Sequence, residues 1–453
     1  MNKTWQDLVH GERWRSPDVL WVEEGTEHSW QEVDDLATSI ERALSARGSA
    51  RVVLIRSGTK LGHFAGQLGA WRAGWAAVMD DGTLGPDEID RVRPNLSMSV
   101  YGGTTVVEGV SGTRVPDGVV AVNFTSGSTG SRKAVAVTRD NLMALVNCGD
   151  LDVPVDHRLT SGSFATPAFD GWWFDTWVAV AAGGKVVCLP NVNEDVFEWS
   201  DLVERHRVDR VLLPAAVIAA LLDVLPEAIA GIPWVFSGGE QFHLSTYRRA
   251  REAGLTNRFV NLYGPTEATF ATHKYVLPED FTGDTIPIGR PLDGLAHRSR
   301  DLDGSRELVV EGPFVCLGYL EGGELTTRFD NRYRTGDVVQ EDAEGNLVFA
   351  GRMDSRIKVN GKRVDAAVLE HEVTGVAGVS ACRVAQHEGR TVAFAAVEPG
   401  TPQDDGFRAR VESVVRISST AIAVELVDRF PVKPGGKVDT AALLDHHLRE
   451  TGV

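Results

Sequence analysis

The sequence reads Asn123-Phe124-Thr125-Ser126-Gly127-Ser128-Thr129-Gly130-Ser131-Arg132-Lys133 between two short apolar runs, residues 119–122 and 134–137. This pattern predicts a loop that joins two neighbouring strands. Glycines let backbone N–H groups approach an anion closely, while the hydroxyl residues and Lys133 add hydrogen-bond donors and a positive charge. We therefore expect a site that suits a polyphosphate.

Two other interpretations of this loop compete with polyphosphate binding. A P-loop needs glycine immediately before its lysine, Ser or Thr after it, and then a helix. Lys133 is instead preceded by Arg132 and followed by Ala134 and a strand-like run, which excludes a P-loop. A flexible loop rich in serine and glycine stays open on local composition alone. Motifs elsewhere in the chain are needed to distinguish polyphosphate binding from a flexible loop.

Composition bounds the class of protein. The chain has 453 residues, too many for one core, so two or three domains are expected. Its net charge of -17 argues against nucleic acid or an anionic membrane as a partner. Four scattered cysteines without a C-x-x-C pair indicate neither a disulfide framework nor a zinc site. With no membrane-spanning apolar stretch and no N-terminal signal region, we expect a cytoplasmic protein.

The first hundred residues alternate between strand-like and helical patterns. Strands are expected at 19–22, 51–55 and 76–79, and helices at 30–45 and 61–74. This alternation is typical of βαβ units, in which a mixed or parallel sheet is covered by helices.

Three later segments, 209–214, 234–240 and 258–269, are predicted to be strands that end in loops. In an open α/β sheet, loops at the carboxyl ends of strands line the ligand crevice, so these three should converge there. A β-rich layer is expected to follow at 286–312.

Residues 169–177 form an aromatic run that contains Asp170 and Asp175. One interpretation is an amphipathic helix whose aromatic rings face the core and whose acids face water. The other is that Asp170 meets a cation, because an unpaired carboxylate in apolar company is costly. The local sequence leaves both open.

The last hundred residues show a separate pattern. Residues 351–361 pack glycine, arginine and acid closely, which places a domain boundary near Asp354. Helices are expected at 365–374 and 406–416, strands at 391–398 and 422–428, and a final loop at 431–439 exposes Lys437. We expect a large α/β domain over 1–353, with mixed sheets, helices and the β-rich layer, and a small mobile α/β domain over 354–453.

Six segments in order resemble the core motifs of the adenylate-forming superfamily, and more narrowly the amino-acid-activating adenylation domains of nonribosomal peptide synthetases. They are residues 125–130, 169–170, 263–267, 333–337, 351–354 and 434–439. One such motif is weak evidence, whereas six in order over nearly the whole chain are specific.

The resemblance implies an ATP site in the large domain. The glycine-rich loop would hold the β- and γ-phosphates, assisted by Lys133. Tyr263 would stack on adenine and Asn261 would contact its edge. Asp337 would accept hydrogen bonds from the ribose hydroxyls, supported by Arg352. The implied ATP-binding residues are Thr125, Ser126, Gly127, Ser128, Thr129, Gly130, Lys133, Gly239, Asn261, Tyr263, Gly264, Asp337 and Arg352.

The resemblance also implies the chemistry. Thr266 would bind the α-phosphate, and Glu267 would hold Mg²⁺ through a hard carboxylate oxygen. Lys437 would bind the substrate carboxylate and the charge that develops at the α-phosphate. After pyrophosphate leaves, the small domain would swing about the hinge Asp354 and present another face to a thiol acceptor, which gives AMP and a thioester.

The substrate class follows mainly from Asp170, which in the amino-acid-activating branch pairs with the substrate ammonium group. The other implied pocket residues are all apolar: Gly171, Phe174, Leu212, Phe236, Gly238, Leu262, Phe270 and Ala271. A polar substrate side chain would find no partner there, so we expect an aliphatic one. Phe236 and Phe270 could equally restrict the pocket to something small.

No carrier-protein signature follows Lys437, so we expect a free-standing ligase that acts on a separate phosphopantetheinylated carrier protein. One alternative is an acyl-CoA synthetase that uses CoA as the thiol. Another is a non-catalytic relative that binds nucleotide or a partner protein. The presence of Glu267, Asp337 and Lys437 together argues against the last of these.

Overall fold

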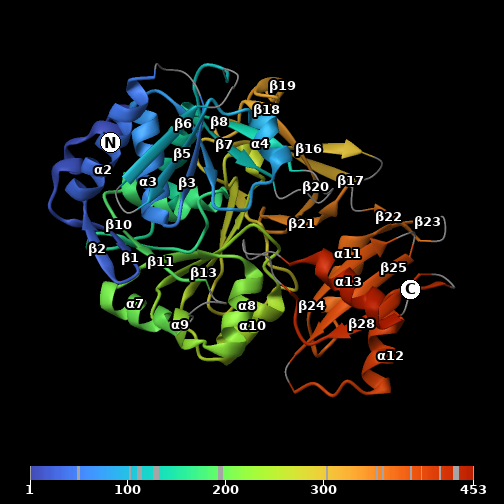
Figure 1. Cartoon of the computed structure of the whole chain (residues 1–453). Coiled ribbons are helices and arrows are strands. Elements are labelled where there is room, and N and C mark those ends of the chain that lie inside the picture. The colour runs from blue at the N-terminus through green and yellow to red at the C-terminus, as the bar shows by residue number, and fades with distance from the viewer. Residues whose placement is uncertain are drawn as a thin grey trace.

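The computed structural model describes residues 2–47, 52–101, 104–109, 115–125, 132–191, 197–302, 305–353, 356–359, 362–387, 390–398, 400–417, 420–431 and 438–451. Two large mixed sheets and their helices form the greater part of the molecule, and a smaller group of C-terminal elements lies beside them (Figure 1). The predicted α/β fold class is confirmed. None of the helices within these ranges is long and apolar enough to cross a membrane.

The first large sheet has eight strands. In spatial order they are β19 (Glu324–Arg328), β18 (Gly318–Glu321), β8 (Ala134–Thr138), β7 (Val119–Phe124), β4 (Ala76–Asp80), β3 (Val52–Ser57), β5 (Leu96–Tyr101) and β6 (Thr104–Gly109). Strands β3, β4, β5 and β7 are parallel neighbours, whereas β7 and β8 pair antiparallel. The glycine-rich stretch therefore connects two neighbouring strands, as its sequence predicts.

The second large sheet has nine strands. In spatial order they are β15 (Arg290–Pro291), β14 (His273–Val276), β13 (Arg258–Tyr263), β12 (Trp234–Ser237), β11 (Arg210–Leu213), β9 (Thr160–Ser163), β10 (Lys185–Cys188), β1 (Val19–Glu23) and β2 (Thr26–Ser29). Strands β9, β11, β12 and β13 run parallel, so their carboxyl ends share one edge of the sheet. This arrangement confirms the predicted convergence of the three strand-end loops.

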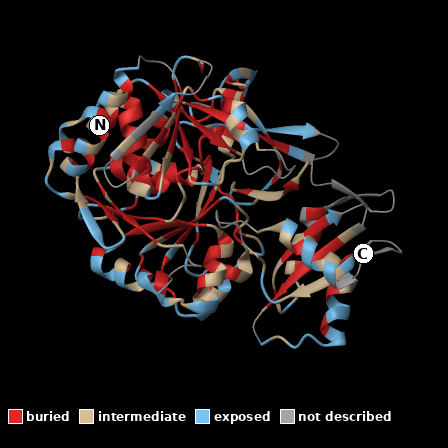
Figure 2. Ribbon diagram, viewed as in Figure 1, coloured by how far each residue is buried: buried red, intermediate tan, exposed pale blue. Residues whose placement is uncertain are grey.

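Helices cover both sheets, and buried residues concentrate between the layers (Figure 2). Helix α2 shows why: its N-cap Ser29 and Glu32 form a capping box, and the buried residues Val33, Ala37, Ile40 and Leu44 lie along one face. The helices of this part are α1 (Trp5–His10), η1 (Glu12–Arg15), α2 (Trp30–Ser45), α3 (Lys60–Arg72), α4 (Pro86–Val92), α5 (Arg139–Val146), η2 (Gly149–Leu151), α7 (Glu198–His206), α8 (Ala215–Val224), α9 (Glu227–Ala230) and α10 (Leu244–Glu252).

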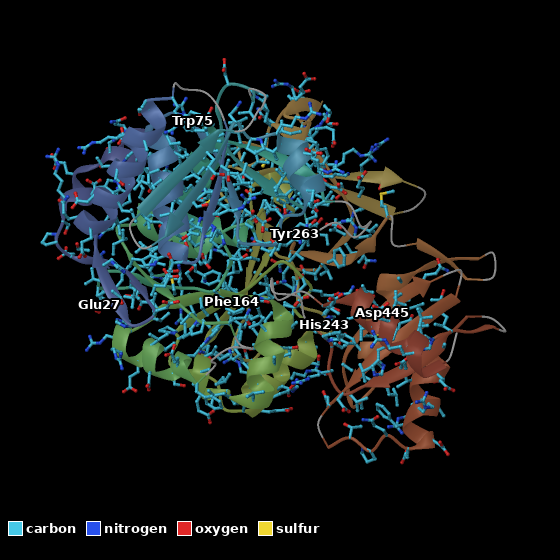
Figure 3. The ribbon with its side chains drawn as sticks, in the orientation of Figure 1. Glu27, Trp75, Phe164, His243, Tyr263 and Asp445 are labelled. Carbon is cyan, nitrogen blue, oxygen red and sulfur yellow. The ribbon has the colours of Figure 1, made fainter. Side chains whose placement is uncertain are left out.

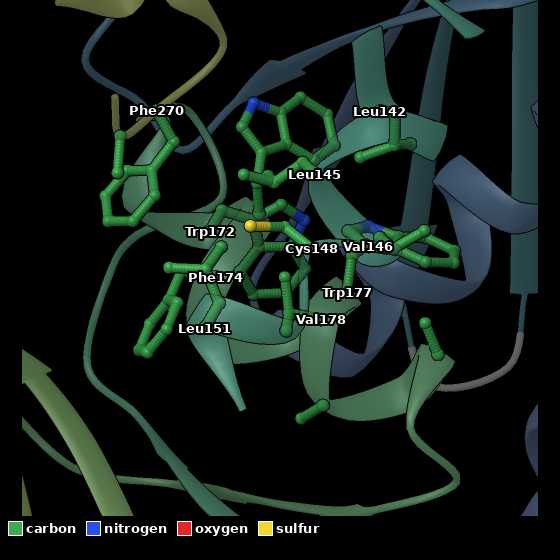
Figure 4. Close-up of a cluster of buried hydrophobic side chains, with 14 of the residues drawn as sticks. Leu142, Leu145, Val146, Cys148, Leu151, Trp172, Phe174, Trp177, Val178 and Phe270 are labelled. Carbon is green, nitrogen blue, oxygen red and sulfur yellow. The ribbon is translucent and has the colours of Figure 1, made fainter. Parts of the chain in front are cut away.

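The aromatic run forms the π-helix η3 (Trp173–Val178), which continues into α6 (Ala179–Ala181). Every residue of η3 is buried, and Figure 4 shows part of its aromatic and aliphatic surroundings. The indole N–H groups of Trp172 and Trp177 both donate to Gln67 Oε1. The interpretation that the acids of this run face water is wrong for Asp175, which is fully buried because the helix packs on all sides.

A four-stranded antiparallel sheet forms the predicted β-rich layer, but residues 290–291 pair with β14 in the nine-stranded sheet instead. The order of the four-stranded sheet is β16 (Ala296–Leu302), β17 (Ser305–Glu311), β20 (Arg332–Glu341) and β21 (Leu347–Arg352). An isolated bridge between Gly289 and Leu347 joins it to the segment that precedes β15. The layer therefore lies against the nine-stranded sheet.

The C-terminal elements have hydrophobic clusters of their own, drawn from residues 366–444. They are β22 (Arg356–Val359), β23 (Lys362–Asp365), α11 (Ala366–Thr374), β24 (Val379–His387), β25 (Arg390–Val397), α12 (Asp405–Val414), β26 (Arg416–Ile417), β27 (Thr420–Ala421), β28 (Ala423–Val427) and α13 (Thr440–Thr451). Strand β24 and helix α13 were not predicted from the sequence. The Ser245 hydroxyl on α10 donates to Ser380 O on β24 at 2.9 Å, which joins this group to the larger part.

Candidate active site

The candidate site lies where the carboxyl ends of β11, β12 and β13 meet, at the predicted crevice. The segment after β13 turns through the short helix η4 (Thr266–Ala268). The Thr266 hydroxyl donates a hydrogen bond to Asp170 Oδ2 at 2.6 Å. The structure thus brings together two predicted site residues that lie 96 positions apart in the chain.

Tyr263, Asp337 and Arg352 form a second group, and Figure 3 labels Tyr263 near the centre of the molecule. Tyr263 Oη donates to Asp337 Oδ2, and Arg352 Nη1 donates to Asp337 Oδ1 at 2.9 Å. Burial, reinforced by the negative charge of Asp337, raises the pKa of Tyr263, so the phenol keeps its proton and remains a donor. The carboxylate predicted to bind ribose is therefore ordered beside the ring predicted to stack on adenine.

Three further residues predicted to bind ATP lie on or directly after β12 and β13. Asn261 is buried on β13, and its Nδ2 donates to Pro287 O at 2.8 Å. Gly264 follows β13 at a point where a side chain does not fit, because a Cβ atom there would lie 2.5 Å from Phe270 O. Gly239 lies in the turn that follows β12.

Glu267 meets two tyrosines from other parts of the fold. Tyr319 Oη on β18 donates to Glu267 Oε1 at 2.5 Å, and Tyr333 Oη on β20 lies 3.2 Å from Tyr319 Oη. Burial, followed by the negative charge of Glu267, raises the pKa of both phenols. Lys133 Nζ lies 4.7 Å from the centroid of the Tyr319 ring, which places an ammonium and the Glu267 carboxylate around one tyrosine.

These residues fit Mg²⁺ only as an ion shared with a phosphate. Within the described ranges, no group of three or more His, Cys, Asp or Glu residues could hold a metal. Mg²⁺ typically binds one or two carboxylates together with substrate phosphates. The buried Glu267 provides such a carboxylate, and the Lys133 ammonium lies on the ring of Tyr319, which donates to Glu267.

The structure describes only the neck of the glycine-rich loop. Thr125 N donates to Lys133 O at 3.0 Å, and Lys133 N donates to Thr125 Oγ1 at 3.1 Å. These two hydrogen bonds fix the ends of the loop against each other. The predicted site residues Ser126, Gly127, Ser128, Thr129, Gly130, Asp354 and Lys437 lie outside the described residues.

A strained turn links η4 to the predicted substrate pocket. Thr269 has φ of 67° and ψ of -50°, and Phe270 N donates to Ala268 O at 2.8 Å, which is the geometry of a γ-turn. Such a conformation is costly for a β-branched residue. The Thr269 hydroxyl anchors the turn by donating to Phe314 O at 2.6 Å. The turn sets the direction of Phe270.

The apolar pocket residues also come together. Leu212 and Phe236 oppose each other on β11 and β12, and Leu262 lies on β13. The Phe174 ring contacts two others, with centroids 4.8 Å from Phe236 and 5.7 Å from Phe270. Leu212, Phe236, Phe174, Leu262, Phe270 and Ala271 all belong to one buried cluster.

Two glycines complete this group. A Cβ atom on Gly171 would lie 3.2 Å from Leu212 Cδ2, and one on Gly238 would lie 3.5 Å from Leu212 Cδ1. All the predicted substrate-pocket residues are thus neighbours of Leu212, of the three phenylalanines or of one another.

Three residues of this region were not predicted from the sequence. Tyr319 carried no local signal, because only the pairing of β18 with β8 brings it to Glu267. Arg210 could have been found from the sequence, because a charged residue within an apolar strand needs polar partners. Asp175 was predicted only as part of the aromatic run. It accepts a hydrogen bond from Ala165 N at 2.8 Å, and a Cβ atom on Gly171 would lie 3.2 Å from Ala165 Cβ.

Comparison with known proteins gives consistent results. Residues 105–320 match the family described as AMP-binding enzyme. Malpibaldin synthetase of Mortierella alpina is 30% identical in an alignment of length 350 that covers 71% of this chain and 6% of that protein. The L-allo-isoleucine:holo-[CmaA peptidyl-carrier protein] ligase of Pseudomonas savastanoi pv. glycinea is 29% identical in an alignment of length 347 that covers 72% of this chain and 58% of the ligase. The chain therefore spans only a small part of the long synthetase that it matches.

Solved structures of other proteins have the same fold as this chain. IdnL7 has a TM-score of 0.78 and 22% identity, with 99% of this chain and 100% of that chain covered. Klebsiella oxytoca NpsA in complex with 3-hydroxyanthranilyl-AMSN has a TM-score of 0.79 and 16% identity, with 98% and 99% covered. At these identities the likeness concerns the fold alone.

Proposed function

We propose that the chain, whose residues 105–320 match the AMP-binding enzyme family, is an acid–thiol ligase of the nonribosomal peptide synthetase type. In this proposal it activates an apolar amino acid as the aminoacyl adenylate. The aminoacyl group then passes to the phosphopantetheine thiol of a carrier protein. The name of the Pseudomonas ligase, which acts on a peptidyl-carrier protein, supports the choice of acceptor.

One observation carries this proposal: the 2.6 Å hydrogen bond between Thr266 and Asp170. In an α-amino acid the ammonium and carboxylate groups share one carbon. An ammonium paired with Asp170 therefore brings its carboxylate next to the phosphate that Thr266 binds. A carboxylate at this place has no such role for a substrate without an amino group.

The neighbouring groups support an ATP site in the same crevice. We assign adenine to Tyr263, the ribose hydroxyls to Asp337 with Arg352, and the outer phosphates to Lys133 and the loop from Thr125 to Gly130. When bound, Mg²⁺ on Glu267 neutralises phosphate charge, which lowers the repulsion that an attacking carboxylate meets. Tyr319 holds the Glu267 carboxylate in place by donating to Oε1.

The second half-reaction needs a different arrangement of the C-terminal elements. We propose that residues 1–353 and 354–453 are separate domains, that Asp354 is the hinge, and that Lys437 acts in the first half-reaction only. The separate hydrophobic clusters of the C-terminal elements support this division, because a part with its own core can move as a unit.

The test is amino-acid-dependent exchange of labelled pyrophosphate into ATP, across a panel of aliphatic, aromatic, polar and β-amino acids. We expect exchange with an apolar amino acid that falls by at least roughly 100-fold in Asp170→Ala and in Lys437→Ala. Asp301→Ala, at an exposed aspartate on β16, is the matched control and should keep full exchange.

Two results would contradict the proposal. Exchange with simple carboxylic acids that persists in Asp170→Ala would remove the ammonium-binding role and favour an acyl-activating enzyme. Exchange followed by transfer to free CoA, with none to a carrier protein, would favour an acyl-CoA synthetase.

A further inference from the structure

The floor of the predicted substrate pocket is made of three phenylalanine rings from three separate elements. Phe174 comes from η3, Phe236 from β12 and Phe270 from the γ-turn after η4. Phe174 is 0%, Phe236 2% and Phe270 7% exposed, although no substrate covers them. An open pocket leaves its lining accessible to water, so these rings already fill most of the space.

The two glycines of the pocket do not add room. Gly171 and Gly238 have no side chains, but the methyl groups of Leu212 fill the space beside both. A Cβ atom on Gly171 would lie 3.2 Å from one of these methyl groups, and a Cβ atom on Gly238 would lie 3.5 Å from the other. Leu212 is itself only 6% exposed. Of the six apolar side chains of the predicted pocket, Leu212 and Phe270 have the largest exposed fractions, and both fractions are small.

Arg210 packs against the Phe174 ring of this floor. It lies two residues before Leu212 on β11, so the two side chains share one face of the strand. Its guanidinium carbon lies 4.3 Å from the Phe174 ring centroid, and its Nη2 donates to Phe174 O at 3.1 Å. Burial lowers the pKa of Arg210 to about 10, which still leaves it charged at neutral pH.

Further hydrogen bonds keep Arg210 in place. Its Nη1 donates to Leu151 O at 2.9 Å and its Nε to Ser161 Oγ at 3.3 Å. Because the residue is fully buried with these partners, it cannot move aside for a substrate without leaving them unpaired. The Phe174 ring therefore cannot move towards Arg210 to make room for a substrate. The γ-turn at Thr269 likewise restricts the movement of Phe270.

We propose that this pocket selects an amino acid whose side chain is a hydrogen atom or a methyl group, and excludes branched aliphatic and aromatic amino acids. This inference rests on the proposed function, in which Asp170 binds the ammonium group at the edge of the same pocket. Phe270 is the residue that limits side-chain size, and Arg210 is a positioning residue that acts through Phe174.

The first experiment measures pyrophosphate exchange by the wild-type enzyme with glycine, alanine, valine, leucine and phenylalanine. We expect kcat/KM to be highest for glycine or alanine, and at least about tenfold lower for valine and leucine, because each excess methylene is discriminated roughly 10- to 200-fold. A maximum at valine, leucine or phenylalanine would overturn this inference and leave the proposed function intact. Absence of exchange with every amino acid would overturn the proposed function itself.

The second experiment changes the floor. Phe270→Ala should raise the leucine-to-alanine ratio of kcat/KM at least about tenfold, since it removes the most accessible ring. Phe197→Ala, at an exposed phenylalanine, is the control and should leave the ratio unchanged. An unchanged ratio in Phe270→Ala would contradict the inference.

Arg210→Lys tests the positioning role, because a lysine ammonium cannot contact both carbonyls and the ring at once. We expect a higher KM for alanine and a higher leucine-to-alanine ratio, with KM for ATP unchanged. Arg258→Lys, at an exposed arginine on β13, is the matched control. Equal changes in KM for alanine and for ATP would indicate a purely structural role and would contradict the positioning role.

Discussion

Two residues of the site lower the stability of the fold and are held in place by hydrogen bonds. Asp175 is a fully buried carboxylate that accepts hydrogen bonds from Ala165 N and from Thr176 Oγ1, at 2.8 Å and 2.9 Å. Thr269 keeps a positive φ because its hydroxyl is bound to Phe314 O. Both residues act on the pocket indirectly, through Ala165 and Phe270. Such costs are typical of functional sites, where geometry matters more than stability.

Asp175 gives a prediction about pH. Burial raises its pKa to about 7 from 3.8, so the folded state keeps a proton that the unfolded state loses. Its contribution to stability is complete below the lower value and is lost as the pH rises through about 7. Between these values, the free energy of unfolding of the wild type should fall relative to that of Asp175→Asn by up to about 1.4 kcal/mol per pH unit.

Urea unfolding of both proteins at several pH values in this window measures the difference. A difference that does not change with pH would show that Asp175 does not titrate there. Asp301→Asn, at an exposed aspartate, is the control and should follow the wild type.

Among the elements, the hairpin of β20 and β21 shows how a sheet places a ligand group. Asp337 and Arg352 oppose each other across it, so the register of the two strands sets their ion pair. The hairpin departs from regular geometry at Gly336, whose φ is +72°. This irregularity immediately precedes Asp337, and a Cβ atom at Gly336 would lie 3.4 Å from Arg352 Nη2.

Gly336→Ala should therefore affect both stability and ATP binding. A left-handed conformation costs an alanine about 1–2 kcal/mol. Relaxation of the strained backbone should shift the adjoining Asp337, which we expect to raise KM for ATP several-fold. Urea unfolding and steady-state kinetics measure the two effects.

Gly109→Ala is the matched control, because nothing lies within 4 Å of its Cβ position. An unchanged KM for ATP in Gly336→Ala would show that the hairpin tolerates the methyl group without moving the ion pair.

In the molecule as a whole, the candidate ATP site joins three sheets that also share one buried hydrophobic cluster. Tyr263 belongs to the nine-stranded sheet, Asp337 to the four-stranded sheet, and Tyr319 to the eight-stranded sheet. A ligand that contacts all three adds connections that the unfolded chain cannot make. Ligand binding should therefore stabilise the large part as a unit.

We expect MgATP to raise the unfolding temperature of the wild-type protein. At 100 times Kd, binding adds about 2.7 kcal/mol to the free energy of unfolding. Asp337→Ala should lose most of this increase, because it removes the ribose partner. Thermal unfolding with and without MgATP measures the effect, and GTP at the same concentration is the control. An equal increase in Asp337→Ala would contradict the assignment of Asp337 to the ribose.

Much of the fold was predictable because its signals are local. Helix 30–45 has its capping box and its apolar face in one stretch of sequence, and the structure has the same bounds. The strands on either side of the glycine-rich stretch are likewise β-branched and apolar. Strand β24 was missed, and the π-helical winding of η3 has no signature in its residues, since an aromatic run is compatible with either helix type.

For the candidate site, the sequence by itself determined which residue types are present and in which order, because a carboxylate, a hydroxyl or a lysine carries its chemistry wherever the chain places it. Only the tertiary structure decided that Thr266 donates to Asp170, that Tyr319 donates to Glu267 and that Arg210 stands behind Phe174. These contacts join positions distant in the chain, and they depend on strand order and on the packing of layers. No local pattern encodes either of these.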